Sequence, residues 1–161
     1  MKFDREKNYN NWFDSKFYHI LYENRDSKEA KKFIRNIIHY FNLDKNALIL
    51  DAGCGKGRHS IHLEKFGYNV LGIDLAKKSI VEAKKNENSN LKFEVHDMSI
   101  PLQKKFDLVL NLFTSFGYKS KEKDIKTLTA FHKNLKNSGV GVLDFLNIEK
   151  VKKEIIFSET I

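Results

Sequence analysis

The fold of this chain is decided by the stretch "LILDAGCGKGRHS", residues Leu48–Ser60. An apolar run ends at Asp51, and Gly53, Gly55 and Gly57 then follow at every second position. Glycine has no Cβ atom, so a loop of this kind can turn sharply and bring its backbone close to a ligand. The pattern therefore predicts a buried β-strand that leads through a ligand-binding loop into a helix.

The spacing of the glycines indicates which class of ligand the loop accepts. A dinucleotide fingerprint, G-x-G-x-x-G, counted from Gly53 requires a glycine at position 58, where this chain has Arg58. The arginine side chain obstructs the close helix–strand packing of a pyrophosphate site, whereas its guanidinium suits a single carboxylate through two parallel hydrogen bonds. The loop therefore favours a nucleoside that carries an amino acid, and it disfavours a nicotinamide dehydrogenase.

Composition and charge limit the class of protein to which this chain can belong. The chain has 161 residues, of which 41% are hydrophobic and 31% charged, as expected for a globular domain. Its apolar runs are far shorter than the ~18 residues of a membrane span, and its first residues lack the apolar core of a signal peptide. A single cysteine, Cys54, excludes an internal disulfide, so we expect a cytoplasmic protein without a membrane partner.

The net charge of +8 raises the question of a nucleic-acid partner. The basic residues are mostly lysines in short, scattered pairs, which is typical of a solvated surface. A nucleic-acid reader more often clusters arginine with exposed aromatic residues. Nucleic acid is therefore disfavoured as a partner, although RNA stays an open alternative.

Hydrophobic periodicity predicts strands that alternate with helices after residue 46. The expected strands are 47–51, 69–74, 91–96, 106–112 and 140–146. The expected helices are 56–66, 76–86, 121–136 and one that begins at 149, preceded by a helix that Ser27 caps and that runs to residue 43. This order predicts an α/β fold with a mostly parallel sheet and helices on both faces.

Two details of these helices are specific enough to test. Gly67 is expected to end the helix 56–66 in a left-handed conformation, and Gly139 to close the turn after the helix 121–136. The helix 76–86 is expected to turn Ile80, Val81 and Ala83 toward the sheet.

In parallel sheets, ligands bind beyond the carboxyl ends of the strands, where the strand order reverses. That rule selects Asp51, Asp74, Asp97 and Asn111, each at or just past the end of an expected strand. A carboxylate at Asp74 can accept hydrogen bonds from vicinal ribose hydroxyls. The alternatives are that Asp74 caps a helix and that Asp97 closes a short turn.

Residues at the ends of the second and third expected strands suit the binding of an adenine ring. Leu75 can flank a face of the ring. Asp97 can accept a hydrogen bond from the exocyclic amine, and the backbone N–H of Met98 can donate one to the ring.

Four motifs in register resemble class I S-adenosylmethionine-dependent methyltransferases. They are the acid and glycine loop, the acid after the second strand, the Asp97–Met98 pair and "FDLVLNLFTSFGY" at 106–118. The segment "WFDSKFYHILY" with "GKGRHS" is similar to small methyltransferases of uncharacterised substrate common in Bacteroidetes. The resemblance implies a Rossmann-like fold, S-adenosylmethionine as cofactor, and methyl transfer to an unidentified small-molecule acceptor.

The resemblance also implies which residues hold the cofactor. Its methionine end lies on the glycine loop, where Asp51 orients the backbone and Arg58 pairs with the carboxylate. The backbone of Asn111 and Leu112 and the ring of Phe113 line the sulfonium side. The complete expected set is Asp51, Gly53, Gly55, Gly57, Arg58, Asp74, Leu75, Asp97, Met98, Asn111, Leu112 and Phe113.

On the acceptor side the resemblance implies a lid formed by residues 1–45, followed by the S-adenosylmethionine-binding domain, 46–161. Residues on or near this side give weak catalytic candidates, His19, Tyr18 and Tyr118. His19 is included because an imidazole titrates near neutral pH. No group of His, Cys, Asp or Glu has metal-ligand spacing, so no metal is expected.

Members of the resembled family continue past the fifth strand with two further strands, which leads us to expect a C-terminally truncated fold. The apolar segment 140–146 would then be an exposed edge strand, and such edges favour self-association. Two alternatives to a small-molecule methyltransferase stay open: an RNA or other nucleic-acid methyltransferase, and a non-catalytic fragment or subunit that only binds S-adenosylmethionine.

Overall fold

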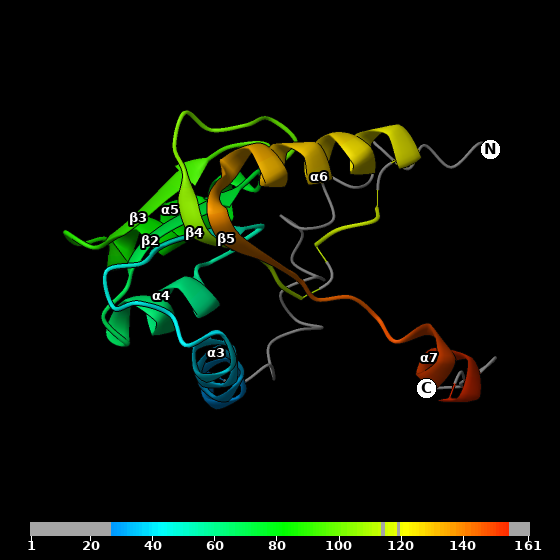
Figure 1. Ribbon diagram of the computed structural model, residues 1–161, viewed down its shortest axis with the longest axis horizontal. Helices are drawn as coiled ribbons and strands as arrows, with labels where there is room; N and C mark the ends of the chain where they lie inside the picture. The colour runs from blue at the N-terminus through cyan, green and yellow to red at the C-terminus, as the bar shows by residue number, and fades with distance from the viewer. Residues whose placement is uncertain (1–26, 114, 119, 155–161) are drawn as a thin grey trace.

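The computed structural model of the chain describes residues 27–113, 115–118 and 120–154 (Figure 1). In chain order the elements are α3 (Ser27–Phe41), β1 (Leu48–Ala52), α4 (Arg58–Lys65), β2 (Asn69–Asp74), α5 (Lys77–Ala83), the 3-10 helix η1 (Lys84–Asn86), β3 (Leu91–Val95), β4 (Phe106–Asn111), α6 (Lys121–Asn134), β5 (Leu135–Leu143) and α7 (Ile148–Glu154). The catalytic candidates Tyr18 and His19, in the expected lid segment 1–45, lie outside the described residues.

The five strands form one parallel sheet in the order β3-β2-β1-β4-β5. The predicted parallel α/β fold is confirmed. The chain moves outward from β1 to β2 and β3, then returns to the other side of β1 to form β4 and β5. The strand order therefore reverses between β1 and β4, and the carboxyl ends of these two strands flank the crevice where such sheets bind ligands.

Alternation along the strands divides the core into two layers. Ile49, Leu108 and Leu110 pack with Leu63 of α4 and Ile34 of α3. The residues between them face the opposite layer. There Leu50 and Val109 pack with Phe106 and with Phe131 of α6. Figure 1 shows the resulting arrangement, with α6 on one side of the sheet and α3 and α4 on the other.

The junction between α3 and α4 contains two buried histidines. Ser27 is the first residue of α3, and its Oγ lies 2.9 Å from Nε2 of His62 on α4. His59, one turn earlier on α4, is 9% exposed and lies beside the ring of Phe33. This contact places α3 against the helix that follows the glycine loop.

Three details of the predicted helices can be compared with the structure. Gly67 follows the last residues of α4 with φ of 95°, and its N–H donates to the carbonyl of Glu64, as predicted for a helix end. The inward orientation of Ile80 and Ala83 is confirmed, but Val81 is 66% exposed, so that prediction was wrong. The regular helix α5 is only about two turns long, and its buried residues are Ser79, Ile80 and Ala83, a narrow face that excludes position 81.

The fifth strand begins earlier than predicted and is irregular. It starts at Leu135, directly after α6, and its register jumps from the pair Phe106–Leu135 to the pair Leu108–Val140. Gly139 therefore lies within β5, in the irregular segment between these two pairs, where a Cβ atom would be 2.9 Å from the carbonyl oxygen of Phe106 and 3.0 Å from the backbone nitrogen of Lys136. Among the described residues β5 is the outermost strand on this side of the sheet, and the exposed edge stays a prediction.

Within the described ranges, the helices are all too short or too polar to cross a membrane.

Candidate functional site

The loop after β1 has the backbone that its glycines predict. Gly53, Gly55 and Gly57 have φ angles of 80°, 55° and 80°, in a region that other residues rarely adopt. The N–H groups of Gly53 and Cys54 both donate to the carbonyl of Ile73, which fastens the loop to β2. Among the described residues, no atom outside the two chain neighbours of Gly55 lies within 4 Å of the position that a Cβ of this glycine would take.

Asp74, the last residue of β2, is joined directly to this loop. Its Oδ2 accepts a hydrogen bond from the N–H of Gly55 at 2.8 Å, and its Oδ1 accepts one from the N–H of Ala76 at 2.8 Å. Asp74 does not cap the helix as the alternative expected, because the N-cap of α5 is Ala76 and no side chain caps it; the second bond instead forms a turn that leads into α5. The first bond brings a carboxylate and a glycine loop together beside the crevice.

Asp51 lies beneath the loop and is 1% exposed. Burial raises the pKa of its carboxyl from 3.8 to about 6, and the charge of Asp74 acts in the same direction. The hydroxyl of Ser60 donates to its Oδ2 at 2.5 Å and lowers the pKa, as does the charge of Arg58. Asp51 therefore ties β1 to α4 through Ser60, and its orienting role toward the glycine loop stays a prediction.

Arg58, the first residue of α4, lies between two other elements. Its Nη1 is 3.8 Å from Oε2 of Glu29 on α3. Its guanidinium carbon is 5.5 Å from the centre of the Phe113 ring, within range of a cation–π interaction. The predicted carboxylate-binding side chain is thus at the border of the glycine loop, in contact with the loop after β4.

Asn111, the last residue of β4, bridges the crevice with its side-chain amide. Its Nδ2 donates to the carbonyl of Ala52, the last residue of β1, at 2.7 Å and lies 3.5 Å from Sδ of Met98. Its Oδ1 is fully buried and has no hydrogen-bond partner among the described residues. Buried acceptors are nearly always paired, so this oxygen marks a place where a bound molecule can supply a donor.

The loop after β4 starts with a strained residue. Leu112 is 2% exposed, and Phe113 has φ of 62°, a conformation that costs a residue with a side chain about 1–3 kcal/mol. The N–H of Phe113 donates to Oδ2 of Asp144 at 2.9 Å, and the N–H of Asp144 donates to the carbonyl of Asn111 at 2.9 Å. This residue after β5 therefore holds the loop in its strained form.

Sequence reasoning missed Asp144, although the signal was present. The strand that was expected to run to position 146 ends at Leu143, so Asp144 is the first residue past its carboxyl end. The rule that selected Asp51, Asp74 and Asn111 would have selected Asp144 as well, had the strand been ended three residues earlier.

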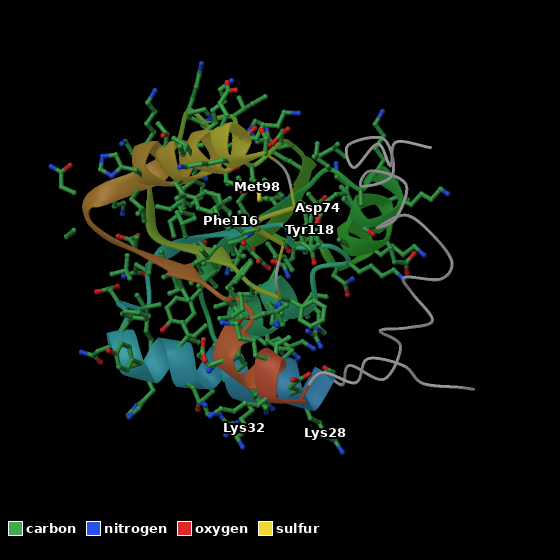
Figure 2. The ribbon with its side chains drawn as sticks, turned by 90° about the vertical axis from the view of Figure 1, so that its right-hand side faces the viewer. Lys28, Lys32, Asp74, Met98, Phe116 and Tyr118 are labelled. Atoms are coloured by element: carbon green, nitrogen blue, oxygen red, sulfur yellow. The ribbon has the colours of Figure 1, made fainter. Side chains whose placement is uncertain are left out.

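The remaining predicted residues lie at the rim of the site. Oδ1 of Asp97 accepts hydrogen bonds from the N–H and the hydroxyl of Ser99, each at 2.8 Å, so the turn-forming alternative is confirmed for this residue. Met98 is half-buried against the second core layer, and Leu75 is 40% exposed. Figure 2 shows Asp74, Met98, Phe116 and Tyr118 in the same part of the molecule, away from Lys28 and Lys32 on α3.

The loop that carries Tyr118 also reaches the glycine loop. The Oγ of Ser115 is 3.5 Å from the carbonyl oxygen of Gly53, and a Cβ atom on that glycine would lie 2.8 Å from the Cβ of Ser115. Tyr118 itself is 46% exposed. Among the residues that the structure describes, no cluster of His, Cys, Asp and Glu could hold a metal ion.

Known proteins with a similar sequence are methyltransferases. A family model described as "Methyltransferase domain" matches residues 49–139. The glycine/sarcosine N-methyltransferase of Aphanothece halophytica is 30% identical over 142 residues, which are 84% of this chain and 52% of that protein. This chain therefore spans about half the length of that curated relative.

Solved structures of methyltransferases have the same fold. An S-adenosylmethionine-dependent methyltransferase from Clostridium acetobutylicum superposes with a TM-score of 0.66 at 27% identity, over 78% of this chain and 55% of that one. A TehB-like methyltransferase from Corynebacterium glutamicum gives a TM-score of 0.60 at 28% identity, over 70% of this chain and 59% of that one.

Proposed function

Since the chain belongs to the class I S-adenosylmethionine-dependent methyltransferase family, we propose that it binds S-adenosylmethionine and transfers the methyl group to a small-molecule acceptor. One observation carries the cofactor assignment. The 2.8 Å hydrogen bond from Gly55 to Asp74 unites a left-handed glycine loop and a carboxylate beside the crevice between β1 and β4. A nucleoside with an amino-acid tail needs this combination, because its ribose requires acceptors and its tail requires exposed backbone.

The buried amide of Asn111 supports the fit of the cofactor. Its unpaired Oδ1 needs a donor, and the amide lies beside Ala52 at the start of the glycine loop. S-adenosylmethionine carries an ammonium group on the part of the molecule that we assign to this loop. The sulfonium side would then follow along Leu112 and Phe113, and Asp74 would hold the ribose.

The adenine end is assigned to the rim residues. Met98 and Leu75 supply apolar surface for the two faces of the ring. Asp97 has one carboxylate oxygen engaged in its turn with Ser99, and we propose that the backbone of this turn, together with the carboxylate, borders the adenine amine.

Arg58 would pair with the carboxylate of the cofactor by exchanging its contact with Glu29. That contact is 3.8 Å long, and the glutamate side chain is 59% exposed. Ion pairs of this kind contribute only about 0–1 kcal/mol, so a ligand carboxylate that offers two parallel hydrogen bonds can replace it. Because Glu29 lies on α3, the exchange would also connect cofactor binding to the segment 1–45, the proposed lid.

S-adenosylmethionine, when bound, supplies an electrophilic methyl group on its sulfonium. The chain's own contribution is alignment, since holding two reactants in line replaces a bimolecular encounter by a unimolecular step. Asp144 fixes Phe113 at 2.9 Å, and the ring of Phe113 faces Arg58. These contacts would hold the loop after β4 in one conformation beside the methyl group.

We infer the class of methyl acceptor from the names of similar proteins. The relative from Aphanothece halophytica is named for two small amino-acid acceptors, which supports a small molecule here. One observation favours the nucleic-acid alternative: an mRNA cap guanine-N(7) methyltransferase from Schizosaccharomyces pombe is 31% identical over 127 residues, 70% of this chain and 35% of that protein. A fragment that binds S-adenosylmethionine without catalysing methyl transfer is a further alternative. We also propose that the protein is cytoplasmic.

Calorimetry with S-adenosylhomocysteine tests the cofactor assignment. We expect the wild-type chain to bind this product, and Asp74→Ala to lose about 1.5–3 kcal/mol of binding free energy, because a hydrogen bond to a charged group is removed. Glu82→Ala, on the exposed surface of α5, is the control and should bind normally. Binding of NAD in place of S-adenosylhomocysteine would contradict the cofactor, whereas unchanged affinity in Asp74→Ala would contradict only the ribose assignment.

A further inference from the structure

The carboxylate of Asp144, which holds the loop after β4, is not among the residues that we assign to direct contact with the cofactor. The backbone N–H of Asp144 donates to Asn111, and its Oδ2 accepts from Phe113 at 2.9 Å. Among the described residues, every recorded hydrogen bond to this carboxylate ends on Oδ2. The side chain is half-buried, so Oδ1 can meet a ligand while Oδ2 keeps the loop in place.

The strand order places Asp144 on the side of the acceptor. The proposed cofactor crevice lies between β1 and β4, and β5 is the next strand beyond β4. A residue just past the carboxyl end of β5 is therefore separated from the glycine loop by the loop after β4. That loop begins with Leu112 and Phe113, which we assign to the sulfonium side, so Asp144 would lie on the side of this loop where an acceptor can approach the methyl group.

Aromatic side chains accompany this carboxylate. A Cβ atom on Gly117 would lie 3.0 Å from the ring of Phe145, so the residue after Asp144 packs on the loop that carries Phe116 and Tyr118. Phe145 and Tyr118 are 52% and 46% exposed. Figure 2 shows Phe116 and Tyr118 in the same region as Asp74 and Met98. A carboxylate beside exposed aromatic rings is the usual chemistry for holding an organic ammonium group.

We propose that Asp144, with the rings of Phe145 and Tyr118, forms an acceptor subsite for an amine. This inference rests on the proposed function and names its substrate class. The amine binds as an ammonium and reacts after losing a proton to water. Its nitrogen lone pair then forms the nitrogen–carbon bond as the carbon–sulfur bond breaks, and that bond's electron pair stays on sulfur.

The surrounding charges agree with a cationic acceptor. Arg58 contacts the Phe113 ring, and its charge is opposed by Glu29 at 3.8 Å in the free chain and would be opposed by the cofactor carboxylate after the proposed exchange. An anionic acceptor would have to approach the carboxylate of Asp144, which like-charge repulsion disfavours. A neutral alcohol could still donate a hydrogen bond to this carboxylate, but it would lack the charge–charge attraction that an ammonium group adds.

A matched pair of probes tests the proposal. Benzylamine is protonated at pH 7, and benzyl alcohol has nearly the same shape without the charge. Each is titrated by NMR into chain saturated with S-adenosylhomocysteine, with saturation established separately for every variant. We expect the wild type to bind benzylamine at least tenfold more tightly than benzyl alcohol.

Two variants separate the charge of Asp144 from its structural role. Asp144→Asn keeps an oxygen that can accept from Phe113 but removes the charge, and it should reduce the benzylamine preference to less than threefold. Asp124→Asn changes a carboxylate of similar burial in the first turn of α6 and should keep the full preference.

Equal binding of the two probes to the wild type, or an unchanged preference in Asp144→Asn, would overturn the amine subsite and leave the cofactor assignment intact. Failure of the wild type to bind S-adenosylhomocysteine would instead refute the proposed function.

Discussion

The carboxyl ends of β1 and β5 belong to one sheet but are built differently. In β1, all residues from Ile49 to Ala52 are buried, and the loop that follows is fastened to β2 by several hydrogen bonds. In β5, most residues are exposed or half-exposed, and large apolar side chains stay exposed beyond its end, including Phe145 and Leu146. The proposed cofactor side is thus a packed interior, whereas the proposed acceptor side is an open edge.

The difference shows which part of the site is defined by the core of the domain. Gly57 and Gly72 each leave room for the ring of Phe93, with would-be Cβ atoms 2.5 Å from that ring. The start of α4, and with it the glycine loop, therefore has its position set by close packing. At the open edge, positions are set by single hydrogen bonds such as that between Asp144 and Phe113.

The largest expected effect comes from breaking the packing beneath the glycine loop. Gly57→Ala places a Cβ atom against Phe93 at a φ of 80°, so overpacking and left-handed strain act together. We expect it to lower the free energy of unfolding by about 4 kcal/mol. Gly67→Ala is the matched control, because its φ is 95° but nothing lies within 4 Å, and it should cost about 1 kcal/mol.

Urea denaturation measures both variants. Equal losses of unfolding free energy in the two variants would show that backbone conformation alone matters and that the contact with Phe93 does not fix the loop.

A second, smaller effect is a pH dependence that arises only on the packed side. The pKa of Asp51 is raised by burial to about 6 from 3.8, so the folded state binds an extra proton and stability falls as pH rises through this window. The pKa of His59 is lowered by burial to about 4 from 6.5, so here the unfolded state binds the extra proton and stability rises with pH. The two contributions oppose each other in the wild type.

Removing either ionisable side chain should reveal the pH dependence of stability that the other contributes. Each shift corresponds to about 3 kcal/mol. In Asp51→Asn, the free energy of unfolding should increase by about 2 kcal/mol more between pH 4 and pH 6.5 than in the wild type, because most of the Asp51 titration falls in this range. His59→Gln should change in the opposite direction. Urea unfolding at the two pH values tests this, and parallel pH profiles for all three proteins would show that neither group has the shifted pKa.

The glycine loop, the parallel sheet and the strand-end residues could be predicted because each depends on local chemistry. A left-handed backbone requires glycine at positions 53, 55 and 57, and a buried strand requires a continuous apolar run before Asp51. The contacts of Arg58 could not be predicted in the same way. Its neighbours Glu29 and Phe113 are distant in sequence, and only the folded packing brings them together.

Errors in the predictions concentrate where two local signals conflict. Gly139 was expected in a turn before the fifth strand, but it lies within β5, where the register shifts. The reason is that Phe106 pairs with Leu135, so the pairing of β4 with β5 starts earlier than expected. The apolar run that continues through Phe145 and Leu146 hid the end of the strand. Those side chains are exposed, so their hydrophobic character does not indicate that the residues pair with a neighbouring strand. As a result, Asp144 was assigned to the strand.

The smallest expected effect on stability concerns the open edge itself. Leu143 ends β5 and is 42% exposed, so Leu143→Lys should change the free energy of unfolding by only about 0.5 kcal/mol. If the edge mediates self-association, as we propose, the added charge should abolish the concentration-dependent dimer in sedimentation velocity. Val81→Lys adds the same charge on α5, where the side chain is 66% exposed, and should leave the dimer intact. A wild type that stays monomeric at every concentration would show that the exposed edge is protected, because repulsion at a net charge of +8 then outweighs pairing of the strands.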